Sequence, residues 1–170
     1  ASNAGQDDRF GTSVAIDGDR AIVGTNDEFP ETFEESGAYI FERDASGTWG
    51  TPDPGGFQTE TALLRASYAD EDDNFGRSVA IDGDRAIVGA NREDGPFIGL
   101  SSGAAYVFER DASGTWTEVA LLRASNAGLD DDLGRSVAIR GDRAIVGATG
   151  EDGPSDGLDR SGAAYVFERS

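Results

Sequence analysis

Apolar residues alternate with polar or small ones in short segments along the chain, and no segment keeps the 3.6-residue spacing of an amphipathic helix. The β-branched and aromatic residues in these segments favour strands. The tripeptide Asp82-Gly83-Asp84 is typical of a tight hairpin, because glycine adopts a positive φ without strain. The pattern therefore predicts a unit of four short antiparallel strands, which in the middle of the chain fall at residues 78–81, 85–88, 104–109 and 116–122.

This unit is repeated along the chain. Residues 10–24, which span the first two predicted strands, return as 75–89 and again as 133–147. The third strand recurs likewise, and the fourth is present in the first two copies, whereas the sequence reaches residue 170 before it in the third. Tandem four-stranded units are typical of β-propeller blades. We therefore predict a single all-β domain of three antiparallel blades, the last without its outer strand, with boundaries at 1–67, 68–125 and 126–170.

Proline indicates the order of strands within a blade. The first copy carries an insertion with Pro52 and Pro54 beside its fourth strand. Proline has no amide hydrogen to donate to a neighbouring strand, so it is confined to edge strands and bulges. The fourth strand is therefore predicted to be the outer edge of each blade, and the first strand, with small residues such as Ser78 and Ala80, the innermost.

Three pieces of the second copy together resemble the FG-GAP repeat: FGRSVA at 75–80, IVGA at 87–90 and GAAYVF at 103–108. That repeat builds the propeller heads of integrin α-chains and of many microbial surface proteins, so the resemblance implies a propeller with an extracellular or cell-surface location. The proline of the GAP motif is replaced by Asn26, Asn91 and Thr149, and the calcium loop between the first two strands is missing. The resemblance thus implies no calcium at that hairpin. The structural repeat positions are Phe10, Gly11, Gly24, Phe75, Gly76, Gly89, Leu133, Gly134 and Gly147.

Three blades are too few to close a ring, because closed propellers usually have at least about four. An open row leaves apolar blade flanks and a strand edge uncovered, and both promote association. We therefore expect the chain to be part of a larger ring or assembly. The missing blades can come from the remainder of a longer chain, from copies that close a ring, or from neighbours that lend the fourth strand of a polymer. The expected partner is protein, by self-association or within a longer chain.

The charge is strongly negative: 33 Asp and Glu face 14 basic residues, all of them Arg, for a net charge of −19. Such a surface is typical of proteins that work in concentrated salt, where the Debye length falls to about 3 Å at 1 M and self-repulsion is suppressed. It argues against nucleic acid as a partner, which requires a basic surface. No apolar run approaches the ~20 residues that span a bilayer.

Most carboxylates are predicted to gather on one face, because strand alternation puts the loops between strands two and three on the same side as those leading into strand one. One interpretation is a solvated, salt-adapted surface. The other is a calcium site, since Ca²⁺ takes about 6–8 oxygen ligands from carboxylates, carbonyls and water. The candidate ligands are Asp72, Asp73, Glu93, Asp94, Asp130, Asp131, Glu151, Asp152 and Asp156.

Two further residue types recur with the repeat. Arg20, Arg85 and Arg143 each follow a hairpin Asp and are predicted to pair with an Asp at the turn. Trp49 and Trp116 begin the fourth strands. They are interpreted as packing between blades, with sugar stacking as the alternative.

The sequence argues against catalysis. It contains no His and no Cys, and its acidic pairs recur in each unit, whereas an active site needs one asymmetric constellation. We therefore predict a non-catalytic, extracellular binding or structural module: an adhesion, surface-layer or filament component of a salt-adapted microbe. The alternatives are a carbohydrate-binding propeller, for which surface glycan is the partner, and, third, a glycoside hydrolase.

Overall fold

The computed structural model describes residues 9–25, 37–52, 54, 58–68, 72–94, 101–152 and 160–169. Every regular element within these ranges is a β-strand, as the alternating pattern predicts. The strands are β1 (Ser13–Asp17), β2 (Arg20–Gly24), β3 (Ala38–Glu42), β4 (Thr51–Pro52), β5 (Gln58–Thr59), β6 (Ala62–Leu64), β7 (Phe75–Asp82), β8 (Arg85–Ala90), β9 (Ala104–Arg110), β10 (Trp116–Leu122), β11 (Leu133–Arg140), β12 (Arg143–Ala148) and β13 (Ala163–Glu168).

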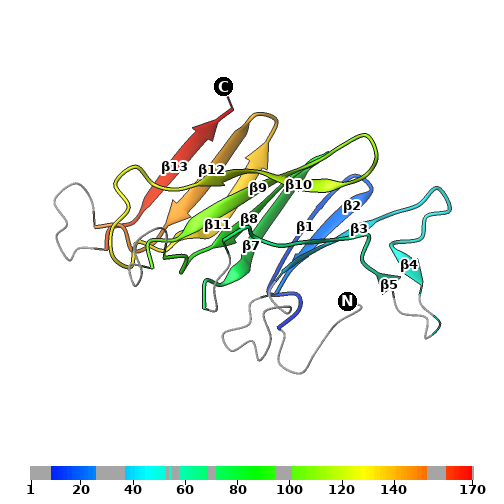
Figure 1. Ribbon diagram of the computed structural model, residues 1–170, viewed down its shortest axis with the longest axis horizontal. Helices are drawn as coiled ribbons and strands as arrows, with labels where there is room; N and C mark the ends of the chain where they lie inside the picture. Colours follow the sequence, from blue (N-terminus) through cyan, green and yellow to red (C-terminus); the bar gives the residue numbers. More distant parts are fainter. Residues whose placement is uncertain are drawn as a thin grey trace.

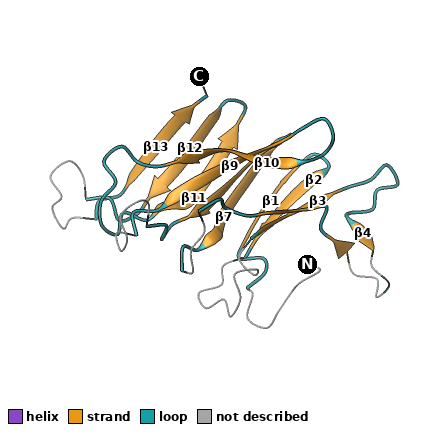
Figure 2. Cartoon of the chain, in the orientation of Figure 1, coloured by secondary structure: helices purple, strands orange, loops and turns teal. Residues whose placement is uncertain are grey.

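The strands form three antiparallel sheets that lie side by side in an open row (Figure 1) and alternate with loops alone (Figure 2). The first sheet has the order β1-β2-β3-β6, the second β7-β8-β9-β10, and the third, within the described residues, β11-β12-β13. This is the predicted all-β fold of propeller-type blades, and the row does not close into a ring. The outer position of β6 and β10 confirms the argument from the prolines, whose insertion adds the small hairpin β4–β5.

The first strands of the second and third sheets are longer than predicted. β7 begins at Phe75 rather than at Ser78, and its pairing with β8 shifts register between these two residues. Gly76 lies in this bulge with a φ of 95°, a conformation that favours glycine. The bulge lets the strand continue to Phe75, whose ring is buried and meets Tyr106 edge to face at 5.5 Å.

The hydrophobic core lies between neighbouring sheets rather than within one. Between the first and second sheets, Ile22 and Ile40 on one side pack with Val79 and Val88 on the other. Between the second and third sheets the corresponding cluster contains Ile87, Val107 and Val146. The second sheet therefore buries one face against the first sheet and the other against the third.

Glycine lets the second strand of one sheet lie very close to the first strand of the next sheet. A β-carbon on Gly24 would overlap the carbonyl oxygen of Gly76, and one on Gly89 would overlap that of Gly134. Serines on the first strands, β1 and β7, join neighbouring sheets, because Ser13 Oγ donates to the Gly76 carbonyl (2.8 Å) and Ser78 Oγ to that of Gly134 (2.7 Å). The repeated glycines and serines thus specify how one sheet sits on the next.

Each end of the row presents an apolar face. Val14 and Ile16 on β1 are 69% and 67% exposed, whereas their counterparts in the second sheet, Val79 and Ile81, are each 8% exposed. At the other end, Val166 on β13 is 65% exposed where its counterpart Val107 is buried. We call these the first flank (Val14, Ile16) and the last flank (Ile145, Val166).

Candidate functional site

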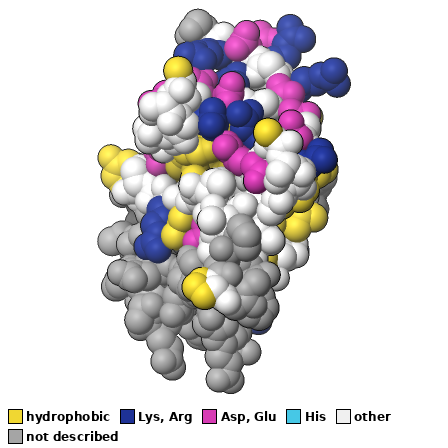
Figure 3. Space-filling model, turned by 90° about the vertical axis from the view of Figure 1, so that its right-hand side faces the viewer, with side chains coloured by type: hydrophobic (Ala, Val, Ile, Leu, Met, Phe, Trp, Pro, Cys, Tyr) yellow, Lys and Arg dark blue, Asp and Glu magenta, His cyan; other side chains and the backbone are white. Residues whose placement is uncertain are grey.

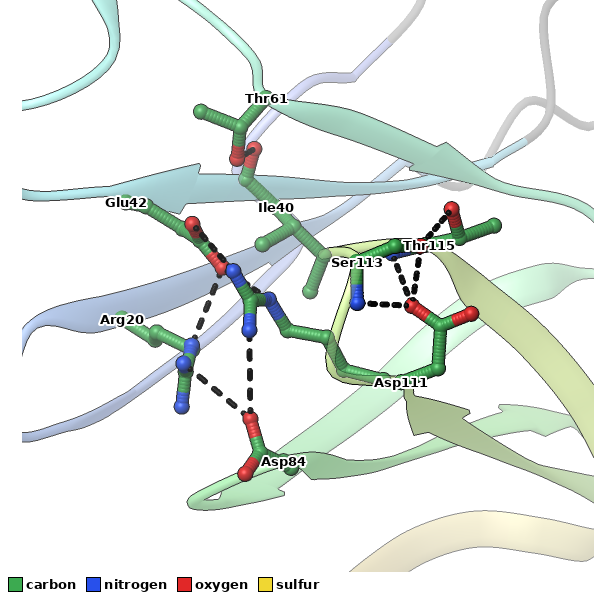
Figure 4. Close-up of polar contacts among 9 residues, drawn as sticks. Arg20, Ile40, Glu42, Thr61, Asp84, Asp111, Ser113 and Thr115 are labelled. Carbon is green, nitrogen blue, oxygen red and sulfur yellow. Dashed lines mark hydrogen bonds and ion pairs between the residues drawn. The ribbon is translucent and has the colours of Figure 1, made fainter.

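Charged residues line the end of the molecule that carries the β1–β2, β7–β8 and β11–β12 hairpins. Antiparallel register places Arg20 opposite Glu42, and its Nε lies 3.0 Å from Oε1 of that residue. Arg20 also reaches Asp84 in the hairpin of the next sheet (3.1 Å; Figure 4). Arg110, on β9 of the second sheet, contacts both Glu42 and Asp84. The predicted Arg–Asp pairing is therefore present at Arg20, but it crosses from one sheet to the next. Arg143 differs, because its ion pair is with Glu168 of its own sheet (2.6 Å). Viewed from the side of the first sheet, Arg and acidic side chains intersperse over this end (Figure 3).

The same contacts recur between the second and third sheets. Arg85 lies 3.1 Å from Glu109 and 3.4 Å from Asp142 of the next hairpin. A backbone contact also repeats: Asp17 accepts a hydrogen bond from the amide of Gly83 (2.7 Å), and Asp82 accepts one from Gly141 (2.6 Å). In the third hairpin the corresponding residue is Arg140, which cannot accept such a bond.

A groove of about 190 Å³ opens between the second and third sheets at their outer side. Apolar side chains from both sheets line it, among them Val119 and Leu122 from β10 and Phe167 from β13, with Arg169 at its rim. Between the first and second sheets the corresponding place is occupied by Trp116 and Leu121, which pack against the first core cluster. Trp116 is thus a packing residue between blades, whereas Trp49 is half-buried and forms an isolated β-bridge with Arg43.

The opposite end brings the acidic connections together, as strand alternation predicts. The Arg92 amide donates to the Asp73 carbonyl (3.2 Å), and the Gly150 amide donates to that of Asp131 (3.0 Å). In both cases a loop after the second strand meets the loop that leads into the first strand of the same sheet. The described acidic segments therefore share one face.

Glu93 on that face is not a solvated carboxylate. It is 3% exposed and forms an ion pair with Arg123, whose Nη2 lies 2.5 Å from Oε1. The hydrogen bond to Glu93 raises the pKa of the Arg123 guanidinium. Burial, together with the negative charges of Glu93 and Asp73, raises the pKa of the Tyr106 hydroxyl. The ion pair ties the residue that follows the outer strand to the acidic loop of the same sheet.

The third sheet arranges its counterpart, Glu151, differently. Glu151 is 4% exposed and accepts hydrogen bonds from Asn126 Nδ2 and from the Tyr165 hydroxyl, both at 2.8 Å. Asp131 is also buried and accepts a hydrogen bond from the Gly128 amide at 2.5 Å. Burial first, and then the neighbouring Glu151, raise the pKa of the Asp131 carboxyl. The interpretation of a uniformly solvated acidic face is therefore wrong for Asp73, Glu93, Asp131 and Glu151, all of which are buried.

The other predicted calcium ligands have individual partners. Asp94 accepts a hydrogen bond from the Ser101 amide (2.8 Å), Asp152 accepts one from Arg160 (3.0 Å), and Asp130 lies 3.6 Å from the Arg160 guanidinium. Asp72 is exposed with a φ of 74°, and Asp156 lies outside the described residues. Within the described ranges no three acidic residues are grouped so that they could hold a metal ion. The calcium site stays a prediction.

The turns between the third and fourth strands contain a motif that the sequence analysis missed, although DASGT occurs twice, at 44–48 and 111–115. The Asp111 carboxylate accepts hydrogen bonds from the amide and hydroxyl of Ser113 and from the amide of Thr115, at 2.6–2.9 Å (Figure 4). Asp44 makes the same bonds in the first sheet. The hydroxyl bond first, and then the Thr amide, lower the pKa of each carboxyl.

We expect these two turns to contribute to acid unfolding. A carboxyl whose pKa is lower in the folded than in the unfolded chain stabilises the fold above the unfolded value, near 3.8, and loses this contribution as the pH falls through the folded value. Asp111→Ala should therefore lower the melting temperature at pH 6 and flatten its fall below pH 3.8. Thermal unfolding at fixed high salt from pH 2 to 6 measures both. Ala112→Ser in the same turn is the control. The expectation would be contradicted if the melting temperature of Asp111→Ala fell with decreasing pH as steeply as that of the native chain.

Comparison with known protein families shows to which family the chain belongs. The family model for the FG-GAP repeat matches residues 1–41, 58–108 and 116–167. The second and third of these stretches include the outer strand of the preceding sheet, β6 and β10, together with the first three strands of the next sheet. The chain belongs to the FG-GAP repeat family. A search of the curated proteins finds no match to the chain. FG-GAP repeats form β-propeller-like modules, often extracellular or binding in function, and the described part of this chain holds no helix that could cross a membrane.

Proposed function

We propose that the protein is a non-catalytic binding or structural module at the surface of a salt-adapted microbe, and that it acts by blade-to-blade association. The observation that supports this is the pair of exposed flanks. In the second and third sheets, the counterparts of the first flank pack against the preceding sheet. In the first and second sheets, the counterparts of the last flank pack against the following sheet, whereas both flanks themselves are exposed. Apolar burial of this kind is the main favourable term in protein association.

Charge supports the same pairing. Within the chain, an Arg of one sheet meets an Asp of the next hairpin, as Arg20 meets Asp84. On the exposed flanks the corresponding residues are Arg143 and Asp19, which are complementary in charge. A non-catalytic role is supported by the buried acidic residues, since Glu93 is neutralised by Arg123 and Glu151 is held by Asn126 and Tyr165.

Association through the flanks is tested by sedimentation at high salt. We expect the chain to self-associate with increasing concentration in 2 M NaCl, and Val14→Arg or Val166→Arg to shift it towards the monomer, because each places a charge in an apolar contact. Ala112→Arg, in an exposed turn, is the matched control and should not change association. A chain that stays monomeric at every concentration and salt would contradict the proposal.

Salt adaptation is tested separately by thermal unfolding. With a net charge of −19, the folded chain should gain stability as salt screens the repulsion between its carboxylates. We expect the melting temperature to rise by several degrees between about 0.1 M and 2 M NaCl. Solutes also stabilise folded proteins by being excluded from the surface, and this effect continues after charge screening has saturated at a Debye length of a few ångströms. The control for it is sucrose at low salt, at a concentration that raises the melting temperature as much as 2 M NaCl does. A melting temperature that is flat or falls with NaCl would contradict salt adaptation.

A further inference from the structure

Two asparagines lie opposite each other at the end of the molecule that carries the acidic loops. Asn74 directly precedes β7 and Asn91 directly follows β8, and antiparallel register makes them the next pair beyond the end of that ladder. In the third sheet the residues at the same two positions, Asp132 and Thr149, approach within 3.5 Å through their side-chain oxygens. The two asparagine side chains are therefore placed to meet.

The side-chain oxygens of both asparagines are buried and accept no hydrogen bond from any described residue. Asn74 is 7% exposed and Asn91 is 2% exposed. The Asn91 amide is oriented by the next sheet, because its Nδ2 donates to Asp132 Oδ1 at 2.8 Å, and this bond fixes which end of the amide is the oxygen. Buried oxygens without a partner are unfavourable and rare in native proteins, and a bound ion or water is a common reason for them.

We propose that the side-chain oxygens of Asn74 and Asn91 bind a small monovalent cation, Na⁺ or K⁺. Uncharged carbonyl oxygens of this kind replace the water shell of such ions. Asp132 contributes one negative charge beside them, whereas calcium sites gather several carboxylates, so the charge of the site suits a monovalent ion better than Ca²⁺. The bound ion would join the two loops of the second sheet and, through Asp132, the loop that leads into the third.

This site goes beyond the proposed salt adaptation. Screening of the net charge of −19 is supplied by any salt, whereas a site distinguishes one cation from another. The negative field of the chain raises the local concentration of cations, and a weak site is filled when the salt concentration exceeds its dissociation constant. A protein that works in concentrated salt would therefore gain stability from the ion as well as from its charge screening.

The cation is tested by melting temperatures in NaCl, KCl and choline chloride, each at about 2 M, because equal ionic strength gives equal screening. Choline is too large to enter a buried site. We expect the native chain to melt a few degrees higher in NaCl or KCl than in choline chloride, because only the small cations bind the folded state. The comparison of NaCl with KCl shows which of the two ions fits better.

Variants of Asn74 locate the effect. Asn74→Gly removes the oxygen at a residue whose φ of 58° suits glycine, and it should abolish most of the difference between the small cations and choline. Asn74→Asp should enlarge that difference by adding a charged ligand, and Asp132 shows that aspartate adopts the same φ of 58° at this position. Asp72→Gly is the matched control, because Asp72 is exposed with a φ of 74°, and it should keep the native difference.

Sodium NMR of the folded chain is the second measurement. The native chain should broaden the sodium signal more than Asn74→Gly does, and the excess should disappear when a competing small cation is added. Equal melting temperatures in the three salts would mean that the two amides satisfy each other, and would overturn the proposal. So would a difference that Asn74→Gly keeps, that Asn74→Asp fails to enlarge, or that Asp72→Gly also loses, since the last would assign it to surface charge. Salt adaptation by screening would stand in each of these cases, provided that choline chloride itself raises the melting temperature.

Discussion

Gly89→Ala is expected to cause one of the largest losses of stability of any single substitution in this protein. A β-carbon at Gly89 would overlap the Gly134 carbonyl oxygen of the next sheet and Ser78 Oγ of its own sheet. The carbonyl belongs to the backbone of the innermost strand and cannot rotate away, so the second and third sheets must separate. Overpacking of a well-packed core costs about 1–3 kcal/mol and occasionally more. We expect about 3 kcal/mol here, since the whole inter-sheet contact is affected.

Gly147→Ala supplies a matched control for that loss. Gly147 occupies the same position in the third sheet, but among the described residues a β-carbon there would closely approach Ser136 Oγ and no carbonyl of a following sheet. A hydroxyl can change rotamer, so this substitution should cost less than about 1 kcal/mol. Guanidinium unfolding of both variants at constant salt measures the difference. Equal losses in the two variants would show that the cost arises within one sheet rather than between sheets.

The fold was predictable because the strands of each blade are indicated by residues close together in the sequence. Alternation, the Asp-Gly-Asp hairpin and the insertion prolines predict four strands and their order, and the structure confirms β10 as an outer edge. The start of β7 at Phe75 was not predictable from alternation, because the bulge at Gly76 interrupts the period of two. A glycine inside a strand pattern was the available signal.

The site was less predictable because its contacts join residues far apart in sequence. Nothing local to Glu93 indicates that Arg123 neutralises it, or that Asp84 pairs with Arg20 of the preceding sheet. Charge counts alone favour a solvated surface, whereas four of the acidic residues are buried by loop-to-loop contacts. By contrast, the DASGT turn is local and repeated. Its Asp could have been identified from spacing alone as the acceptor of hydrogen bonds from the backbone amides of the turn.

Arg123→Met is the second substitution from which we expect a large effect. It removes the charge that faces Glu93, which is only 4% exposed on its side chain, while methionine keeps the apolar stem of the arginine. Breaking a buried ion pair by removing one partner costs about 3–5 kcal/mol, because an uncompensated charge is left behind. Since a third of the Arg123 side chain is exposed, we expect about 3 kcal/mol, at the lower end of that range. Guanidinium unfolding at fixed salt measures it.

Arg160→Met is the matched control, because its ion pair with Asp130 has side chains 69% and 54% exposed and should contribute less than about 1 kcal/mol. The physical cause is tested by adding Glu93→Gln to Arg123→Met. If the loss comes from a stranded negative charge, the neutral amide should recover most of it, because burying an amide costs less than burying a carboxylate. If it comes instead from lost packing of the Arg123 stem, the double variant will be no more stable than Arg123→Met. The first outcome would mean that the charge of Arg123, rather than the packing of its stem, stabilises the buried Glu93 carboxylate.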